Sequence, residues 1–390
     1  MKIIILLCFI AGAHTLIETL ERKCGNDTSN LWLDIVLVID VSTYMTAEDR
    51  KLVKDSVNEI FENTRIGTNH SDPRTTRIGI VFYSGYASIV ADLEKIQDFS
   101  KLSDELVSSL SVHGTEKSYL SLGLTYAEQV LASGRSDNYR SNYQQVVIVF
   151  AATYQAPDQL DPYPVASRMK YTNRNIIIVV DLAQNQTASR ELKQISSSFY
   201  PVPVEYYVNN SNITSLSEVL TYANCHCPKN WTTALNIPTG TCMQAPKIKK
   251  NWMAAKFACQ QEHAHLPSML TEDREATIIR HCKNNLNDFE WNKKFDCHIG
   301  LSFGKDDWYW EQPAGQPRLP LSSNVDQKAF LWSLGYPTNM VENTGVAYRT
   351  NTKSSEDGWV NLNPYNADNY YICEKYACDT DNYCDSCDYC

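Results

Sequence analysis

The sequence has few of the features that mark enzymes. It contains no H-E-x-x-H, G-x-S-x-G or G-x-x-x-x-G-K-[ST] motif, which are signatures of zinc proteases, serine hydrolases and phosphate-binding loops. His263 and His265 are two positions apart and would not share a helix face, so we expect ordinary polar histidines. We therefore predict that the protein is not an enzyme.

The sequence also lacks a basic excess and long apolar runs. It has 35 basic and 45 acidic side chains and a formal net charge of -10, which disfavours attraction to nucleic acid or anionic lipid. No segment after the N-terminus approaches the roughly 18 uninterrupted apolar residues of a membrane-spanning helix. We predict no nucleic-acid partner and no membrane span.

The N-terminus has the layout of a secretory signal peptide, which we place at residues 1–13. Lys2 precedes an apolar run, Ile3 to Ala13, that ends in an A-x-A cleavage pattern. Removing it takes away Cys8 and leaves an even number of the 13 cysteines, as suits disulfides in an oxidising compartment. Glycosylation sequons begin at Asn26, Asn69, Asn185, Asn209, Asn212 and Asn230. We therefore expect a secreted, extracellular glycoprotein.

The cysteines divide the chain into unequal blocks. At 390 residues, the length predicts two or three domains. No cysteine lies between Cys24 and Cys225, whereas ten lie from Cys227 to Cys390. We predict a disulfide-poor domain over 24–225 followed by a disulfide-rich one, with the boundary near residues 222–227. A bond between Cys24 and Cys225 would close the first domain, and pairing of Cys225 within the second domain is the alternative.

The first block alternates strands with helices. Apolar runs typical of buried strands occur at 31–39, 77–83, 145–150 and 175–180, and helical spacing occurs at 48–61, 102–110, 120–132 and 189–195. This order predicts a doubly wound α/β sheet, Rossmann-like and covered on both faces, with any ligand at the carboxyl ends of the strands.

The first strand ends in Asp40-Val41-Ser42-Thr43-Tyr44, and from here the block resembles a von Willebrand factor A domain over roughly residues 30–224. In that family a D-x-S-x-S loop, a threonine and a second aspartate surround a divalent cation. The resemblance assigns Asp40, Ser42 and Ser118 to this metal-ion-dependent adhesion site, but Tyr44 replaces the second serine and Ala152 replaces the third-loop aspartate. Because one carboxylate and one hydroxyl are missing, we expect a degenerate site that holds no metal.

The second block carries short motifs in a recognisable order. They include Cys227-Pro-Lys-Asn-Trp, a helical run over 252–259, Cys297-His-Ile-Gly-Leu, Trp308-Tyr-Trp, Trp359-Val-Asn and Tyr371-Ile-Cys-Glu. This order resembles a long-form C-type lectin-like domain, an α+β disulfide-rich fold, over 227–375. The resemblance implies bonds Cys227–Cys242 and Cys259–Cys373. The family's inner disulfide is absent, which leaves Cys282 and Cys297 for a local bond.

In that family, sugars bind through Ca²⁺ held by E-P-N or Q-P-D on a long loop and by W-N-D on a strand. Here these motifs are Tyr336-Pro337-Thr338 and Trp359-Val360-Asn361, with Glu342 and Asn339 as neighbours. One amide and one carboxylate form a poor Ca²⁺ site, so we expect a degenerate lectin site. We expect Trp308, Trp310, Trp332 and Trp359 to fill the core. The alternative places Trp332, Tyr336, Tyr348, Trp359 and Tyr365 on the binding surface.

The chain ends in a cysteine-rich tail, residues 376–390. Cys384-x-x-Cys387-x-x-Cys390 has metal-ligand spacing, but export favours two small disulfides or intermolecular bonds. The tail could thus link copies into a disulfide-bonded oligomer.

These expectations describe a secreted recognition or adhesion glycoprotein that binds a glycan or protein ligand largely without metal and has no cofactor. The pairing of the two modules is similar to a large group of nematode proteins associated with innate immune responses, which implies a role in defence. Two alternatives stay open: a Ca²⁺-dependent carbohydrate-binding lectin, and a disulfide-linked extracellular matrix component.

Overall fold

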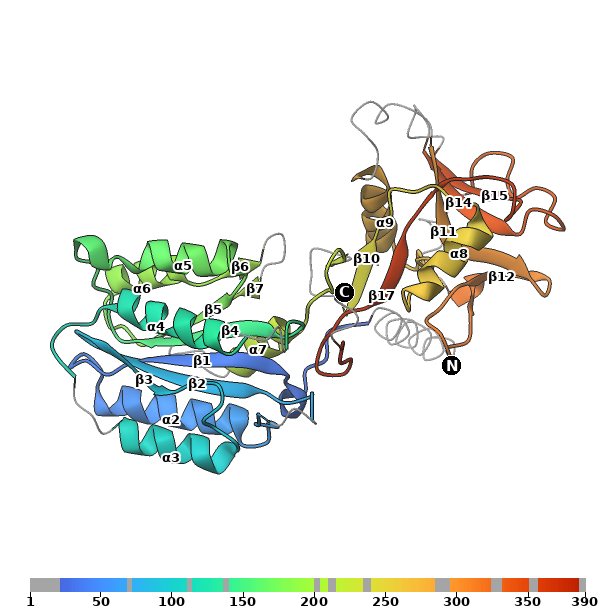
Figure 1. Ribbon diagram of the computed structural model, residues 1–390. Coiled ribbons are helices and arrows are strands. Elements are labelled where there is room, and N and C mark those ends of the chain that lie inside the picture. The colour runs from blue at the N-terminus through green and yellow to red at the C-terminus, as the bar shows by residue number, and fades with distance from the viewer. Residues whose placement is uncertain are drawn as a thin grey trace, which may run out of the picture. The chain divides into compact units, whose positions relative to one another are not determined.

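A computed structural model describes residues 22–68, 72–110, 114–135, 140–199, 204–209, 215–233, 240–284, 295–323, 332–350 and 357–385 (Figure 1). They form two compact units, each considered by itself below. The first domain is Cys24–His226 together with the chain from Cys378 onward, and the second domain is Cys227–Ala377 with Arg22 and Lys23. The predicted signal peptide, Asn69, Asn212, Cys387 and Cys390 lie outside the described residues.

The first domain is built on a mixed sheet with the strand order β3-β2-β1-β4-β5-β8. Its strands are β1 (Leu33–Asp40), β2 (Arg77–Tyr83), β3 (Ala87–Ala91), β4 (Gln144–Ala151), β5 (Ile176–Asp181) and β8 (Tyr207–Asn209). All neighbours pair in parallel except β2 and β3. The predicted Rossmann-like α/β fold is confirmed, and the antiparallel edge strand β3 is an addition that sequence analysis missed.

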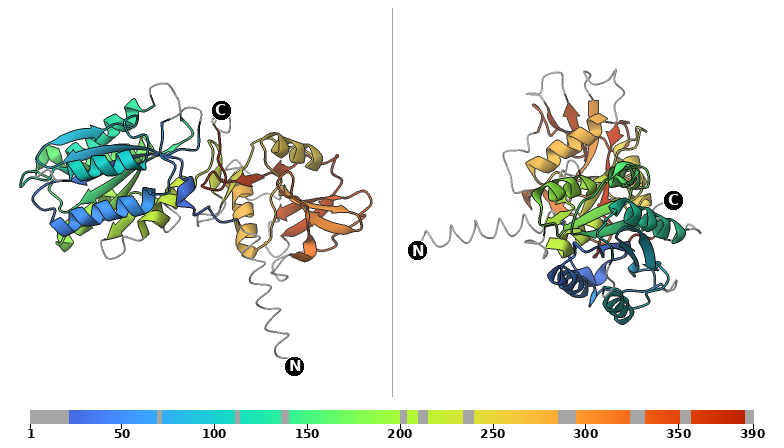
Figure 2. Two further views of the ribbon diagram at one scale, coloured as in Figure 1. Left: turned by 90° about the horizontal axis from the view of Figure 1, so that it is seen from below. Right: turned by 90° about the vertical axis from the view of Figure 1, so that its left-hand side faces the viewer.

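Helices cover both faces of this sheet (Figures 1 and 2). They are α2 (Ala47–Phe61), α3 (Phe99–Ser109), α4 (Leu120–Ser133), α5 (Pro162–Tyr171), α6 (Gln186–Ile195) and α7 (Ser215–Asn224). Because successive side chains of a strand point to opposite faces, Leu37 packs in a core with α2, α3 and α7. Val36 and Val38 pack in a second core with α4, α5 and α6. Short elements complete the domain: η1 (Thr28–Asn30), η2 (Asp158–Leu160), β6 (Ser198–Phe199) and β7 (Val204–Glu205).

A buried ion network lies at the amino end of β1. Asp34 is completely buried and accepts hydrogen bonds from Arg77 Nε at 2.9 Å and Nη2 at 2.8 Å. Arg140 Nε donates to the same carboxylate at 2.9 Å. Both guanidinium groups are also buried, and Asp34 supplies the buried negative charge between them. Glu94, which is largely exposed, adds a second carboxylate that accepts from Arg77 Nη1 at 2.5 Å.

In its described residues, the second domain combines two helices with two sheets, whose strands pair antiparallel with one exception. The helices are α8 (Trp252–Gln261) and α9 (Glu272–Asn284), and one sheet has the order β17-β10-β9, from Cys373–Tyr376, Thr241–Gln244 and Thr232–Thr233. The other has the order β13-β12-β11-β14-β15, from Leu319–Pro320, Asp307–Trp310, Phe295–Gly304, Gly345–Thr350 and Gly358–Leu362, with β16 (Tyr370–Tyr371) pairing in parallel with β11 and η4 (Leu321–Ser323) after β13. This is the α+β architecture that the motifs predicted.

Disulfides join distant parts of each domain. The bonds are Cys24–Cys225, Cys227–Cys242, Cys259–Cys373, Cys282–Cys297 and Cys378–Cys384. The first four are the pairs that sequence analysis expected. Within the described ranges, no helix combines the length and the apolar character needed to cross a bilayer.

The described part of the tail is not a separate segment, contrary to the sequence-based division. Tyr376 belongs to β17 of the second domain, whereas the part from Cys378 packs on the first domain around Trp32. Trp32 is buried and donates from Nε1 to the carbonyl of Asp379 at 2.9 Å. The ring of Tyr383 lies 5.0 Å from that of Trp32. The intrachain bond Cys378–Cys384 closes the tail over this tryptophan. The sequence did not predict this contact, because Trp32 and Asp379 are some 350 positions apart and sequence motifs relate residues that are close together in the chain.

Candidate functional site

The first predicted site assembles where β1 ends. Asp40 is fully buried, and its carboxylate accepts from the Ser42 backbone N–H at 2.7 Å and from the Ser118 hydroxyl at 2.9 Å. Ser118 lies two residues before the start of α4, so the carboxyl end of β1 and the loop before α4 meet as parallel α/β sheets require. The structure thus brings together all three residues assigned to this site.

Burial dominates the electrostatics of Asp40. It raises the pKa of the carboxyl group, while hydrogen bonds from Ser42, from Ser118 and from the Ala152 backbone oppose the rise. Tyr83, which pairs with Asp40 in the β1–β2 register, is buried beside it. Burial and then the charge of Asp40 raise the pKa of the Tyr83 phenol well above its usual value. Sequence analysis missed Tyr83, although its position at the end of a strand adjoining β1 was a usable signal.

The donors around Asp40 do not fit a divalent cation. The Tyr44 side chain is 47% exposed, and its backbone N–H donates to Ser42 Oγ at 3.3 Å. Ala152 contributes no side-chain oxygen, and the Ser118 N–H donates to Gln155 Oε1 at 3.0 Å. Mg²⁺ requires near-octahedral oxygen ligands, usually with one or two carboxylates. Here the single carboxylate, Asp40, already accepts hydrogen bonds from the protein. These residues therefore fit a loop that keeps the family's backbone structure without binding a metal ion.

A second group of possible metal ligands lies at the Cys24–Cys225 disulfide, but it cannot bind a metal ion. Among the described residues, one group of three ligand atoms lies within 4.8 Å of one another, from Cys24, Cys225 and Asp379. Both sulfurs belong to the Cys24–Cys225 disulfide. A disulfide supplies no thiolate, so this group is not a metal centre.

The second predicted site is occupied by its own loop. Asn361, on β15, is 3% exposed, and its Oδ1 accepts from the Thr338 N–H at 2.8 Å. Its Nδ2 donates to the carbonyl of Thr338 at 2.5 Å and to that of Asn343 at 2.9 Å. Both amide hydrogens are therefore used to hold the loop that follows Tyr336-Pro337, and Asn361 acts as a clamp.

The remaining residues of this site do not complete a cation shell. Glu342 is exposed, and its Oε2 accepts from Asn339 Nδ2 at 3.0 Å. In the described part of the loop, no hydrogen bond joins Glu342 to Asn361. The structure thus places the two residues on one loop without bringing their side chains together, and Ca²⁺ would need several more oxygen ligands.

The aromatic residues are mostly structural. Trp308, Trp310 and Trp359 are buried in the core of the second domain and Trp332 is partly buried against it, as predicted. The alternative of an aromatic binding surface is wrong for Tyr348, which is 7% exposed. Tyr336 is half-buried, and its hydroxyl accepts from Arg349 Nη1 at 3.1 Å, so for this residue the alternative stays a prediction. Of the five aromatics considered, only Tyr365 is well exposed, at 64%.

Four of the six sequons lie on described residues, and the asparagine of each is exposed: Asn26, Asn185, Asn209 and Asn230. Asn185 also caps α6, because its side-chain oxygen accepts from the Thr187 N–H at 2.8 Å. Exposure is what attachment of a glycan requires.

Family models match both domains in order. Residues 34–221 match the von Willebrand factor type A domain, and residues 248–375 match the lectin C-type domain. The C-type lectin domain-containing protein 160 of Caenorhabditis elegans is 24% identical over 386 residues, which cover 93% of this chain and 56% of that protein. The C-type lectin domain family 4 member M of Nomascus concolor is 29% identical over 151 residues, covering 39% of this chain and 32% of that protein. The chain thus spans a third to little more than half the length of these curated relatives.

Solved structures give weaker similarities. Proximal thread matrix protein 1 from the mussel byssus is 18% identical, with a TM-score of 0.40 over 51% of this chain and 47% of that one. The VWA domain of SpRpn10 is 16% identical, with a TM-score of 0.35 over 48% of this chain and 94% of that one. A calcium-independent type II antifreeze protein is 20% identical, with a TM-score of 0.28 over 39% of this chain and 96% of that one.

Proposed function

We propose that this chain is a secreted recognition or adhesion protein that binds a glycan or protein ligand without a divalent cation. The proposal is supported by its two domains, which match the von Willebrand factor type A and lectin C-type families in that order. Its disulfides and exposed sequons support an extracellular location. A role in innate immune defence is proposed from the similarity of domain order to nematode proteins alone.

The observation that carries this proposal is the use of Asn361. Its side chain makes three hydrogen bonds to the backbone of its own loop. A Ca²⁺ ion and the clamp would compete for the same amide, and coordination by it would disturb the Thr338 backbone. The buried carboxyl group of Asp40 supports the same conclusion, because hydrogen bonds from Ser42, Ser118 and the Ala152 backbone already use its oxygens.

The test is calorimetry of the mature chain with Ca²⁺ and with Mg²⁺, together with glycan and protein arrays read with and without EDTA. We expect no heat of binding from either ion, and array signals that the chelator leaves unchanged. A positive control shows that calorimetry would detect a bound ion. The double variant Tyr44→Ser, Ala152→Asp restores the hydroxyl and the carboxylate of the family pattern, and it should bind Mg²⁺. Array binding that EDTA abolishes in the wild-type chain would refute the proposal.

A further inference from the structure

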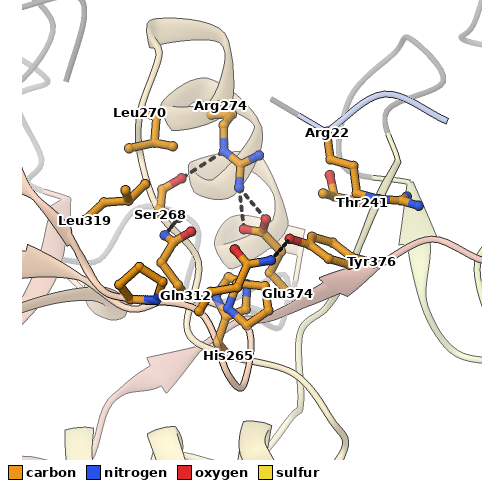
Figure 3. A pocket seen from close by; sticks show the side chains of 13 residues that line it. Arg22, Thr241, His265, Ser268, Leu270, Arg274, Gln312, Leu319, Glu374 and Tyr376 are labelled. Carbon is orange, nitrogen blue, oxygen red and sulfur yellow. Dashed lines mark hydrogen bonds and ion pairs between the residues drawn. The ribbon is translucent and has the colours of Figure 1, made fainter. Parts of the chain in front are cut away.

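The second domain contains a cavity of about 200 Å³ away from both predicted sites. It lies among α9, β10, β17 and the segment that follows β12 (Figure 3). Its volume is below the roughly 300 to 1,000 Å³ typical of pockets for drug-sized ligands, and therefore suits one small ring.

A buried ion pair forms the floor of the cavity. Arg274 Nη2 donates to both carboxylate oxygens of Glu374, and Arg274 Nε donates to the carbonyl of Ser268 at 2.8 Å. Both charged side chains are almost completely buried. A carboxylate oxygen can accept more than one hydrogen bond, so Glu374 keeps acceptor capacity although Arg274 neutralises its charge.

The walls add further hydrogen-bonding groups with defined roles. Gln312 Nε2 donates to the Glu311 carbonyl at 2.7 Å and to Ser268 Oγ at 3.4 Å, which leaves Gln312 Oε1 as an acceptor. Gln316 Nε2 donates to the Tyr376 hydroxyl at 2.8 Å, so the phenol hydrogen of Tyr376 can donate.

The lining thus offers both acceptors and donors, and an apolar side completes it. His265 Nδ1 lies 2.9 Å from a carbonyl oxygen and must carry the hydrogen, so in the neutral ring its Nε2 is an acceptor. Leu270, Leu319 and two prolines supply the apolar surface.

We propose that this cavity binds the ring of a neutral sugar, without metal. A sugar ring offers hydroxyls that donate to Glu374 and Gln312 and accept from Tyr376, and a C–H face that packs on leucine and proline. A cationic amine would also satisfy the acceptors, but Arg22 and Arg274 against Glu374 make the lining net positive, which disfavours a cation. This inference rests on the proposed recognition function and assigns one binding site to it.

The test uses the mature full-length chain in EDTA and saturation-transfer NMR. The probes are the methyl glycosides of glucose, galactose, mannose and N-acetylglucosamine, with n-butylamine as the competing cation. We expect millimolar binding of at least one glycoside and none of the amine. Tyr376→Phe and Gln312→Leu should each weaken that binding by roughly tenfold, the effect of losing one hydrogen bond.

The matched control is Tyr365→Phe, which removes the same hydroxyl from an exposed tyrosine of this domain and should bind like the wild-type chain. The inference is overturned if no glycoside binds, if the amine binds instead, or if Tyr376→Phe binds as tightly as Tyr365→Phe. EDTA-sensitive signals on the arrays would refute metal-free recognition but leave this result standing, so the two failures can be told apart.

Discussion

Replacing Asn361 distinguishes between two roles of this residue: holding its loop through hydrogen bonds, or binding a Ca²⁺ ion. Asn361→Ala removes three hydrogen bonds to the backbone of Thr338 and Asn343. At a net value of about 1 kcal/mol for each bond, the second domain should lose about 3 kcal/mol of its unfolding free energy. Asn361→Asp should cost more, because a charged oxygen would face two carbonyl oxygens in place of an N–H₂ group.

Guanidinium denaturation followed by tryptophan fluorescence measures this loss. Seven of the eight tryptophans follow Cys227 in the sequence, so the signal reports mainly on the second domain. Asn366→Ala is the matched control, because Asn366 is exposed on the same domain and should unfold like the wild-type chain. Each variant is measured in EDTA and in Ca²⁺.

A Ca²⁺ site would give the opposite pattern. An ion present at 100 times its dissociation constant stabilises a protein by about 2.7 kcal/mol. The reasoning fails if Ca²⁺ stabilises the wild-type chain by such an amount, and Asn361→Asp, with its added carboxylate, by still more. It also fails if Asn361→Ala unfolds at the same denaturant concentration as Asn366→Ala.

Three further perturbations test other parts of the structure. Truncation after Ala377 uncovers the buried ring of Trp32, and should lower the stability of the first domain by about 2 kcal/mol in urea denaturation. Glu275→Gln tests a carboxyl group whose pKa is raised to about 7, by burial first and by the charge of a neighbouring glutamate second. Because the pKa of Glu275 is higher in the folded than in the unfolded state, the wild-type chain should lose stability as the pH rises from about 4.5 to 7. The melting temperature of the variant should fall less over the same pH range. Asp34→Ala leaves the buried Arg140 without a carboxylate and Arg77 with only the exposed Glu94, and should cost about 3 to 5 kcal/mol in urea. Lys51→Ala at an exposed pair should change little.

Each of these has a control or an outcome that contradicts it. Truncation after Asp385 keeps the Cys378–Cys384 bond and should leave the stability of the first domain unchanged. Identical pH profiles for Glu275→Gln and the wild-type chain would show that Glu275 titrates normally. If Asp34→Ala were no more destabilising than Lys51→Ala, the buried network would not contribute to folding.

Much of the first domain could be predicted because its strands carry a strong local signal. The expected strand 77–83 coincides with β2, whose seven residues are all buried, and a strand buried on both faces reads as a continuous apolar run. β3 was missed because four of its five residues are intermediate or exposed. Its place at the edge of the sheet depends on pairing with β2, which leaves little trace in its own composition.

The candidate sites were predicted in part. Asp40, Ser42 and Ser118 could be named because motif spacing survives even when ligands are lost, and all three meet in the structure. The clamp role of Asn361 could not be predicted, since an asparagine that binds Ca²⁺ and one that bonds to backbone look alike in a sequence. The cavity floored by Arg274 and Glu374 was missed for a different reason: these two residues are 100 positions apart.

The sequence by itself determined the order of the two domains, the α/β and α+β classes, the cysteines available for pairing, and the loss of ligand residues from both metal motifs. These properties are carried by local periodicity, spacing and residue identity. Only the tertiary structure decided that the tail covers Trp32, that most aromatics face inward, and that a polar cavity forms beside β17. Such features depend on side chains brought together from distant segments, where packing and hydrogen-bond partners are set by the fold rather than by neighbours in the chain.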